Sequence, residues 1–243
     1  MNHFKIMNRQ ISKNGVSLKF PKPYSEIEKE IRSIRYVAAQ FPRGNRVEAN
    51  NQFPPFILCF YDFIFNAIQK KKSNIIPTAE ELATCYLSEN TELKKTYNGF
   101  VLFNNEYYDS RFIKGRLFRS YPSIVRDFQF TLLMNELLQQ KQADCFTCYD
   151  SDKDLNGIDV TICYTGKNFN IGLCVNTDKA KRMIAEKEKR LRVKSLTVPD
   201  SYYALTIIDT GNQSIQCWTK ENCEKVISTI FTGECKNGKV HEI

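Results

Sequence analysis

Histidine is scarce in this sequence, and its scarcity limits the chemistry that the chain can perform. The two histidines, His3 and His241, lie near opposite ends of the sequence. Nucleases and hydrolases that move protons with histidine, and zinc centres built on histidine, therefore lack their working residue here. The sequence also contains neither the glycine pattern of a phosphate-binding loop nor that of a dinucleotide-binding turn.

Cysteine is abundant, with nine residues, and an odd number fits no complete disulfide framework. We therefore expect a reducing, cytoplasmic location. Cys145 and Cys148 form the one close pair, but no second pair follows at the spacing of a zinc site. Burial in a strand is the more ordinary role for such residues, and a metal site at this pair is the alternative.

The C-terminal half has the pattern of strands followed by helices. Three short stretches predict strands at 145–149, 158–164 and 169–175, and Thr165-Gly166 joins the last two as a hairpin turn. A long helix is expected to begin at Pro122, because proline suits the first helical turn. Further along, the sequence predicts a charged helix, two strands and a last helix, at 178–192, 203–208, 214–218 and 221–231.

The hairpin allows residues to be assigned to the two faces of the sheet, because alternate residues of a strand face opposite sides. The isoleucines and valine between 158 and 162 form an apolar face, which leaves Asp159 on the other side. With the two-residue turn, Asp159 lies opposite Gly172, and a slip by one turn residue would place it opposite Cys174. Asp159 therefore shares a face with small and polar residues of the partner strand.

This order of elements, with Asp159 in the second of three strands, resembles the PD-(D/E)XK nucleases, the fold of many restriction enzymes, over residues 116–210. The resemblance implies an α/β (α+β) fold with a mixed central sheet flanked by helices. In that family the second strand provides an aspartate, and the third strand provides an acid and a lysine two residues apart. Divalent cations held by the acids activate water and stabilise the phosphodiester transition state.

The third strand departs from the family pattern, because Gly172, Cys174 and Asn176 occupy the slots of the acid and the lysine. The resemblance then implies that other residues replace them. Asp159 would hold Mg²⁺ or Mn²⁺ with help from Asp178 after the third strand, or from an acid of the preceding helix, Glu136 or, second to it, Asp127.

A replacement for the missing lysine is expected on the helix after the third strand. Lys179 and Lys181 follow Asp178 there and complete the set of catalytic candidates with Asp159 and Glu136. The acidic loop 150–154 is a further candidate, with a solvated turn as the more ordinary interpretation of its composition.

Positive charge indicates a polyanionic partner, either DNA or RNA. Lysine and arginine outnumber aspartate and glutamate by 35 to 27, which gives a formal charge of +8. The residues predicted to contact phosphates are Lys179, Arg182, Lys187, Lys189 and Arg190 on the charged helix, and Arg116, Arg119 and Arg126 around the start of the long helix. A solvated helix face with pairs such as Glu186 and Arg190 is the alternative.

The N-terminal region, 1–115, is predicted to be mainly helical and to pack on a core at 116–243. Capping-box patterns at Ser25–Glu28 and Thr78–Glu81 predict two helix starts. The most apolar run, 53–68, is interrupted by Asp62 and is shorter than a bilayer span, so no membrane partner is expected.

Together these features predict a nucleic-acid-acting protein with a divergent nuclease-like core. The resemblance implies a metal-dependent endonuclease, and the resemblance alone implies a setting in bacterial restriction or phage defence. The alternative is a catalytically inactive subunit that binds nucleic acid, a partner protein subunit or a second copy of itself. Because the third strand lacks the usual acid and lysine, the fold is predicted more firmly than the reaction.

Overall fold

The computed structural model describes residues 3–35, 53–141, 144–155, 158–175, 178, 182, 186, 202–207, 215, 217–232 and 240–242. The main sheet contains β1 (Phe4–Met7), β2 (Gln10–Lys13), β3 (Val16–Lys19), β7 (Phe146–Asp150), β8 (Val160–Tyr164), β9 (Lys167–Val175), β10 (Tyr202–Ile207) and β11 (Val240–Glu242). A small second sheet contains β4 (Lys94–Lys95), β5 (Phe100–Phe103) and β6 (Glu106–Asp109), with a short 3₁₀ turn, η1 (Tyr97–Gly99), before β5. The helices are α1 (Tyr24–Ser33), α3 (Phe56–Gln69), α4 (Ala79–Glu89), α5 (Ser110–Lys141), α6 (Ser151–Leu155) and α8 (Lys220–Phe231).

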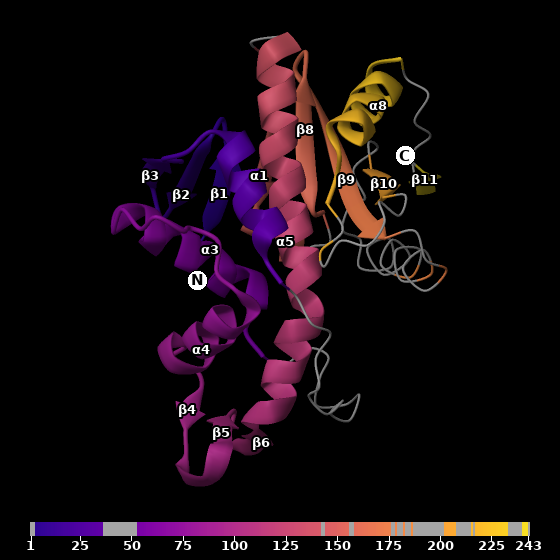
Figure 1. The fold of residues 1–243 in the computed structure, drawn as a ribbon. Helices are drawn as coiled ribbons and strands as arrows, with labels where there is room; N and C mark the ends of the chain where they lie inside the picture. The colour runs from indigo at the N-terminus through magenta and orange to yellow at the C-terminus, as the bar shows by residue number, and fades with distance from the viewer. Residues whose placement is uncertain are drawn as a thin grey trace.

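The main sheet follows the strand order β11-β10-β9-β8-β7-β1-β2-β3 (Figure 1). Neighbouring strands from β3 to β9 are antiparallel, whereas β10 is parallel to β9 and β11 is parallel to β10. This mixed sheet, with helices between its strands along the chain, confirms the expected α+β class.

The β8–β9 hairpin has the predicted turn and register. Thr165 and Gly166 have positive φ angles of 47° and 75°, as a two-residue type I′ turn requires. Tyr164 pairs with Lys167 and Val160 pairs with Ile171, where the pairing ends, directly before Asp159. The alternative register, with Asp159 opposite Cys174, is therefore wrong.

One face of this hairpin is apolar and packs against helices, as strand parity predicted. Val160, Ile162, Ile171 and Leu173 are buried in one hydrophobic cluster. The cluster also contains side chains of α5 and α8, namely Phe130, Leu133, Met134, Leu137, Leu138, Cys223, Val226, Ile227 and Ile230. In Figure 1, α5 crosses β8 and α8 lies over β9, on the side that these residues face.

The first strands of the chain extend the same sheet. Two tight turns, at Asn8-Arg9 and Asn14-Gly15, join β1, β2 and β3, and all four turn residues have positive φ angles. β1 then pairs with β7, with Ile6 opposite Tyr149. These strands were not predicted, and they make the N-terminal region part of the sheet of the core.

The long helix differs from its prediction in where it begins. α5 starts at Ser110, so Pro122 lies inside it and the predicted boundary at 115/116 falls within one continuous helix. The Asp109 carboxylate accepts a hydrogen bond from the backbone N–H of Arg111 at 2.8 Å, which satisfies one free donor at the helix start. Among the described residues, no helix is both long enough and apolar enough to cross a bilayer, α5 included.

One of the two predicted capping boxes is correct. Thr78 and Glu81 exchange hydrogen bonds at the start of α4, at 3.2 and 2.8 Å. Ser25 and Glu28 do not cap α1, because that helix begins one residue earlier, after Pro23, and Glu28 pairs with Arg32 at 2.6 Å. An unpredicted capping box, Thr219 with Asn222, starts α8.

Candidate functional site

Asp159 lies directly before β8 and is fixed to the partner strand. Its backbone N–H donates to the carbonyl of Ile171 at 3.0 Å, and its Oδ2 accepts a hydrogen bond from the N–H of Leu173 at 2.7 Å. The side chain is half-buried. The carboxylate is therefore held in one place at the start of the hairpin, with one oxygen bound to the backbone of β9.

Beside Asp159, a chain of hydrogen bonds crosses the sheet on the side away from the apolar face. Lys153 Nζ donates to Thr161 Oγ1 at 3.1 Å, and Thr161 Oγ1 donates to Asn170 Oδ1 at 3.0 Å. Thr161 and Asn170 are only 1% and 5% exposed, so these polar groups need each other as partners. The chain positions a lysine ammonium over β8.

Lys153 reaches this position because the acidic loop folds into α6 rather than a solvated turn. Asp150 begins the turn by accepting a hydrogen bond from Asp152 N at 3.0 Å, and the carbonyl of Lys153 accepts one from Ile158 N at 2.9 Å. Asp150 itself pairs with Lys5 of β1 at 3.2 Å. The sequence analysis did not single out Lys153, although it lies in the loop considered as a contributor.

Two thiols complete this side of the sheet, which we call the polar face. The polar face consists of Cys148, Asp150, Lys153, Thr161, Cys163 and Asn170. Burial raises the pKa of Cys163 to about 11 and also raises the pKa of Cys148, whereas the Lys153 ammonium acts in the opposite direction on both thiols. Cys163 also donates to Asn168 Oδ1 at 3.0 Å. The predicted zinc alternative at Cys145 and Cys148 fails, because Cys145 belongs to the apolar cluster on the other side.

Three carboxylates act on a pair of buried tyrosines between α3 and β7. Tyr61 of α3 and Tyr149 of β7 are 0% and 1% exposed, with ring centroids 4.3 Å apart. Burial is the main cause that raises the pKa of both, and the carboxylates of Asp127, Asp154 and Asp159 raise both further. Neither hydroxyl has a hydrogen-bond partner among the described residues. The acids of α5, α6 and the start of β8 thus converge on one region.

The two candidate acids of α5, Asp127 and Glu136, have different surroundings. Asn135 faces the sheet, because its Oδ1 accepts a hydrogen bond from Thr147 N at 2.9 Å and its Nδ2 donates to the Thr131 carbonyl. Asp127 lies on the same helix face, four residues before Thr131, whose hydroxyl donates to the Asp127 carbonyl at 2.9 Å. Glu136 lies 3.9 Å from Arg9 of the β1–β2 turn. Of the two acids, Asp127 acts on the same tyrosines as Asp159.

The predicted metal ligands are not brought together. Asp178 is exposed, and its backbone carbonyl accepts a bond from Arg182 Nε at 3.3 Å. No three histidine, cysteine, aspartate or glutamate side chains among the described residues are grouped so that they could hold a metal ion. The described side chains, Asp159, Glu136 and Asp178 included, therefore do not fit a preformed Mg²⁺ or Mn²⁺ centre of three protein ligands.

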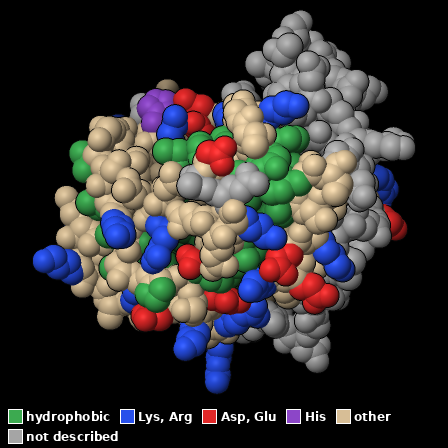
Figure 2. Space-filling model, turned by 90° about the horizontal axis from the view of Figure 1, so that it is seen from above, with side chains coloured by type: hydrophobic (Ala, Val, Ile, Leu, Met, Phe, Trp, Pro, Cys, Tyr) green, Lys and Arg blue, Asp and Glu red, His purple; other side chains and the backbone are tan. Residues whose placement is uncertain are grey.

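The predicted phosphate contacts have different environments. Arg126 is 6% exposed and bonds Ser123 Oγ at 2.9 Å, so its guanidinium is part of the packed interior. Arg116 is half-buried, with its guanidinium 5.4 Å from the centre of the Phe56 ring, and burial lowers its pKa. Arg119 and Arg182 are exposed. Figure 2 shows basic and acidic side chains interspersed over the described surface on that face.

Five of the predicted residues lie outside the described residues, namely Lys179, Lys181, Lys187, Lys189 and Arg190. Among the described members of the predicted set, Asp159 lies at the β8–β9 hairpin, bonded to Leu173 N. Lys153, which the sequence analysis did not single out, bonds Thr161 of the same hairpin from α6. Asp127 of α5 acts on the same two tyrosines as Asp159. The chain was compared with protein-family models, curated proteins and solved structures, and no match was found.

Proposed function

We propose that this chain acts on nucleic acid through a divergent nuclease-like core of the PD-(D/E)XK type. The support is the order of elements: α5, then the antiparallel strands β7, β8 and β9, then β10 parallel to β9. Asp159 lies at the start of the second of these strands, as the resemblance requires. The biological setting proposed with it is bacterial restriction or phage defence.

The observation that carries the proposal is the position of Asp159 at the start of the β8–β9 hairpin, with a lysine of α6 bonded to the same hairpin. The Asp159 carboxylate accepts a hydrogen bond from Leu173 N–H, and the Lys153 ammonium donates to Thr161 of β8. An acid and a lysine are the combination that the third strand lacks. Lys153 is therefore the proposed replacement, as a contact for a phosphate group.

A second candidate function, binding without cleavage, is favoured by one specific observation. The described residues contain no preformed three-ligand metal group, and one oxygen of Asp159 is already bonded to the backbone. Metal-assisted hydrolysis depends on carboxylates that hold the ion. In this form the core binds DNA or RNA, and any reaction is performed by a partner subunit.

Both forms are tested with one set of variants. Asp159→Asn removes the charge but keeps an oxygen that can accept from Leu173 N, and the control Glu221→Gln removes an exposed carboxylate from α8. Plasmid and single-stranded oligonucleotides are incubated with Mg²⁺ or Mn²⁺, and binding is measured in parallel at increasing salt. If the chain is an endonuclease, we expect the wild type to cleave. We then expect the cleavage rate to fall by about 100-fold or more in Asp159→Asn and to stay unchanged in the control.

The remaining outcomes separate the candidates. Salt-sensitive binding without cleavage in any variant supports the binding form. Equal cleavage by the wild type and Asp159→Asn contradicts the assignment of the site. If no nucleic acid binds even at low salt, the proposal as a whole is overturned and a protein-interacting subunit takes its place.

A further inference from the structure

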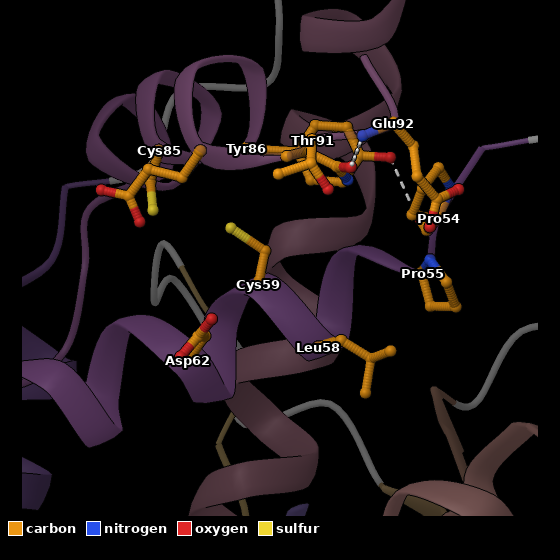
Figure 3. A pocket seen from close by; sticks show the side chains of 11 residues that line it. Pro54, Pro55, Leu58, Cys59, Asp62, Cys85, Tyr86, Thr91 and Glu92 are labelled. Atoms are coloured by element: carbon orange, nitrogen blue, oxygen red, sulfur yellow. Dashed lines mark hydrogen bonds between the residues drawn. The ribbon is translucent and has the colours of Figure 1, made fainter. Parts of the chain in front are cut away.

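A cavity of about 300 Å³ lies between α3 and α4, away from the polar face (Figure 3). Pro54, Pro55 and Leu58 line one part of it, and Glu89 and the residues up to Glu92 line another. No residue of the predicted nucleic-acid site lines it. The cavity has room for several water-sized molecules, because one water occupies about 30 Å³ in the liquid.

Two thiols from different helices meet in this cavity. Cys59 projects from α3 and Cys85 from α4, and both are free and only partly buried. Figure 3 shows the two sulfur atoms pointing into the same space between the helices. The Cys85 side chain is the first cause that raises the pKa of Cys59, so the two thiols that line this cavity are near neighbours. A disulfide between them would require the two helices to bring the Cβ atoms to about 3.8 Å.

The surroundings keep the Cys59 thiol protonated at neutral pH. The hydrogen bond with Cys85, burial, and the carboxylates of Asp62 and Glu89 all raise the pKa of Cys59. Asp62 forms an ion pair with Lys13, which holds that carboxylate beside α3. Because the thiolate is the reactive form, the Cys59 thiol reacts slowly at neutral pH and faster as the pH rises.

We propose that Cys59 and Cys85 are a redox pair, which a hydroperoxide oxidises to a disulfide that joins α3 to α4. One sulfur, as the thiolate, attacks a peroxide oxygen, so that the O–O bond breaks and a sulfenic acid and water (or an alcohol) form. The second sulfur then attacks the sulfenic sulfur, an S–S bond forms, the S–O bond breaks, and the oxygen leaves as water with the remaining proton. The two sulfurs lose two electrons in total, and the peroxide gains them.

A second pair of neighbouring free thiols, Cys148 and Cys163, provides an internal comparison. Cys148 and Cys163 also interact through their side chains, but Cys148 pairs with Thr161 and Cys163 pairs with Phe146. They are diagonal neighbours of an antiparallel ladder, where Cα atoms lie about 7 to 8 Å apart. A disulfide needs a Cβ separation of about 3.8 Å, so this pair cannot close without moving the strands. We therefore expect selective bond formation at Cys59 and Cys85.

The test is oxidation of the full chain with excess hydrogen peroxide over a range of pH, followed by alkylation of the remaining free thiols. Digestion and mass spectrometry are expected to reveal a Cys59–Cys85 linked peptide that dithiothreitol removes, and its yield is expected to rise with pH. Joining α3 to α4 restricts the unfolded chain, so the oxidised protein is expected to melt several degrees higher than the reduced one.

Two variants and one control make the outcome decisive. Cys59→Ser and Cys85→Ser each remove the linked peptide and the rise in melting temperature, whereas Cys163→Ser keeps both. Circular dichroism of the reduced variants shows that each is folded. The proposal is overturned if Cys59 and Cys85 are both alkylated after oxidation of the wild type. It is also overturned if either thiol links to a different cysteine, or if one is over-oxidised without forming a link.

Discussion

The two faces of the β7–β9 sheet are built in different ways. The apolar face buries Val160, Ile162 and Ile171 against α5 and α8, and its stability depends on packing. The polar face buries Thr161 and Asn170 between the same strands, and its stability depends on hydrogen bonds that end at a lysine. Neighbouring residues of one strand thus serve separate purposes. Stability can be changed on one face with little effect on the charges of the other.

The largest difference between the faces is expected for a deletion on the apolar side. Ile171 is 0% exposed, so Ile171→Ala removes buried methyl groups and leaves a cavity, which is expected to lower the free energy of unfolding by about 2 to 5 kcal/mol. Urea unfolding measures the change. The exposed Lys167 lies on the same strand, and Lys167→Ala is expected to change the free energy by less than about 0.5 kcal/mol. Equal effects of the two variants would contradict the packing of this face.

On the polar face, the expected loss has a different cause. Asn170→Ala removes the acceptor of the buried Thr161 hydroxyl and is expected to cost about 1 to 3 kcal/mol of unfolding free energy. Adding Thr161→Val removes the unsatisfied hydroxyl and is expected to restore part of the loss. A double-mutant cycle by urea unfolding measures the coupling. If the free-energy changes of the two single variants simply add up in the double variant, the hydrogen bond between Thr161 and Asn170 does not contribute to stability.

A substitution at Lys153 is expected to weaken nucleic-acid binding while leaving the free energy of unfolding nearly unchanged. Lys153→Met keeps the length of the side chain and removes its charge, so it is expected to change unfolding by less than about 1 kcal/mol. If Lys153 contacts one phosphate, the slope of the logarithm of nucleic-acid affinity against the logarithm of salt concentration becomes shallower by about 0.7 to 0.9. Lys114→Met on α5, also half-buried, is the matched control. Identical slopes for all three proteins would remove Lys153 from the proposed site.

The smallest effect concerns the reactivity of Cys163. Burial raises its pKa to about 11, against about 8.5 for an ordinary thiol, so its alkylation rate is expected to keep rising up to about pH 11. The folded thiol stays protonated where the unfolded one ionises, so its contribution to stability is present below about pH 8.5 and is lost as the pH rises toward 11. Lys153→Met is expected to raise the pKa of Cys163 further. Rates measured by mass spectrometry that level off near pH 8.5 would contradict this environment.

The sequence predicted the β8–β9 hairpin well, because its turn residues and the alternation of apolar residues are local signals. The strands β1–β3 escaped prediction, although Asn14-Gly15 is a strong turn signal, because each strand has four residues and the partner of β1 is the distant β7. Local patterns do not reveal which distant strand completes a sheet.

The site was predicted in part, for a similar reason. The register of β8 and β9 up to Val160, next to Asp159, followed from the hairpin. Lys153 was missed because a run of charges resembles a solvated turn until α6 folds it back over β8. Asp127 was ranked below Glu136, although Asp127, Thr131 and Asn135 form a polar stripe at four-residue spacing in an apolar helix. That stripe was the signal for the helix face that meets the sheet.

The pairing of β1 with β7 has a consequence for how the protein forms during synthesis. β1–β3 are synthesised before β7, so Ile6 has no strand opposite it until Tyr149 has been made, after α3, α4 and α5. Until then, β1 has no partner strand on its outer edge. The sheet is completed only by pairing between residues that are far apart in the sequence, and such contacts slow folding. Substitutions in β1 are thus expected to affect the yield of folded protein in cells more than the chemistry of the polar face.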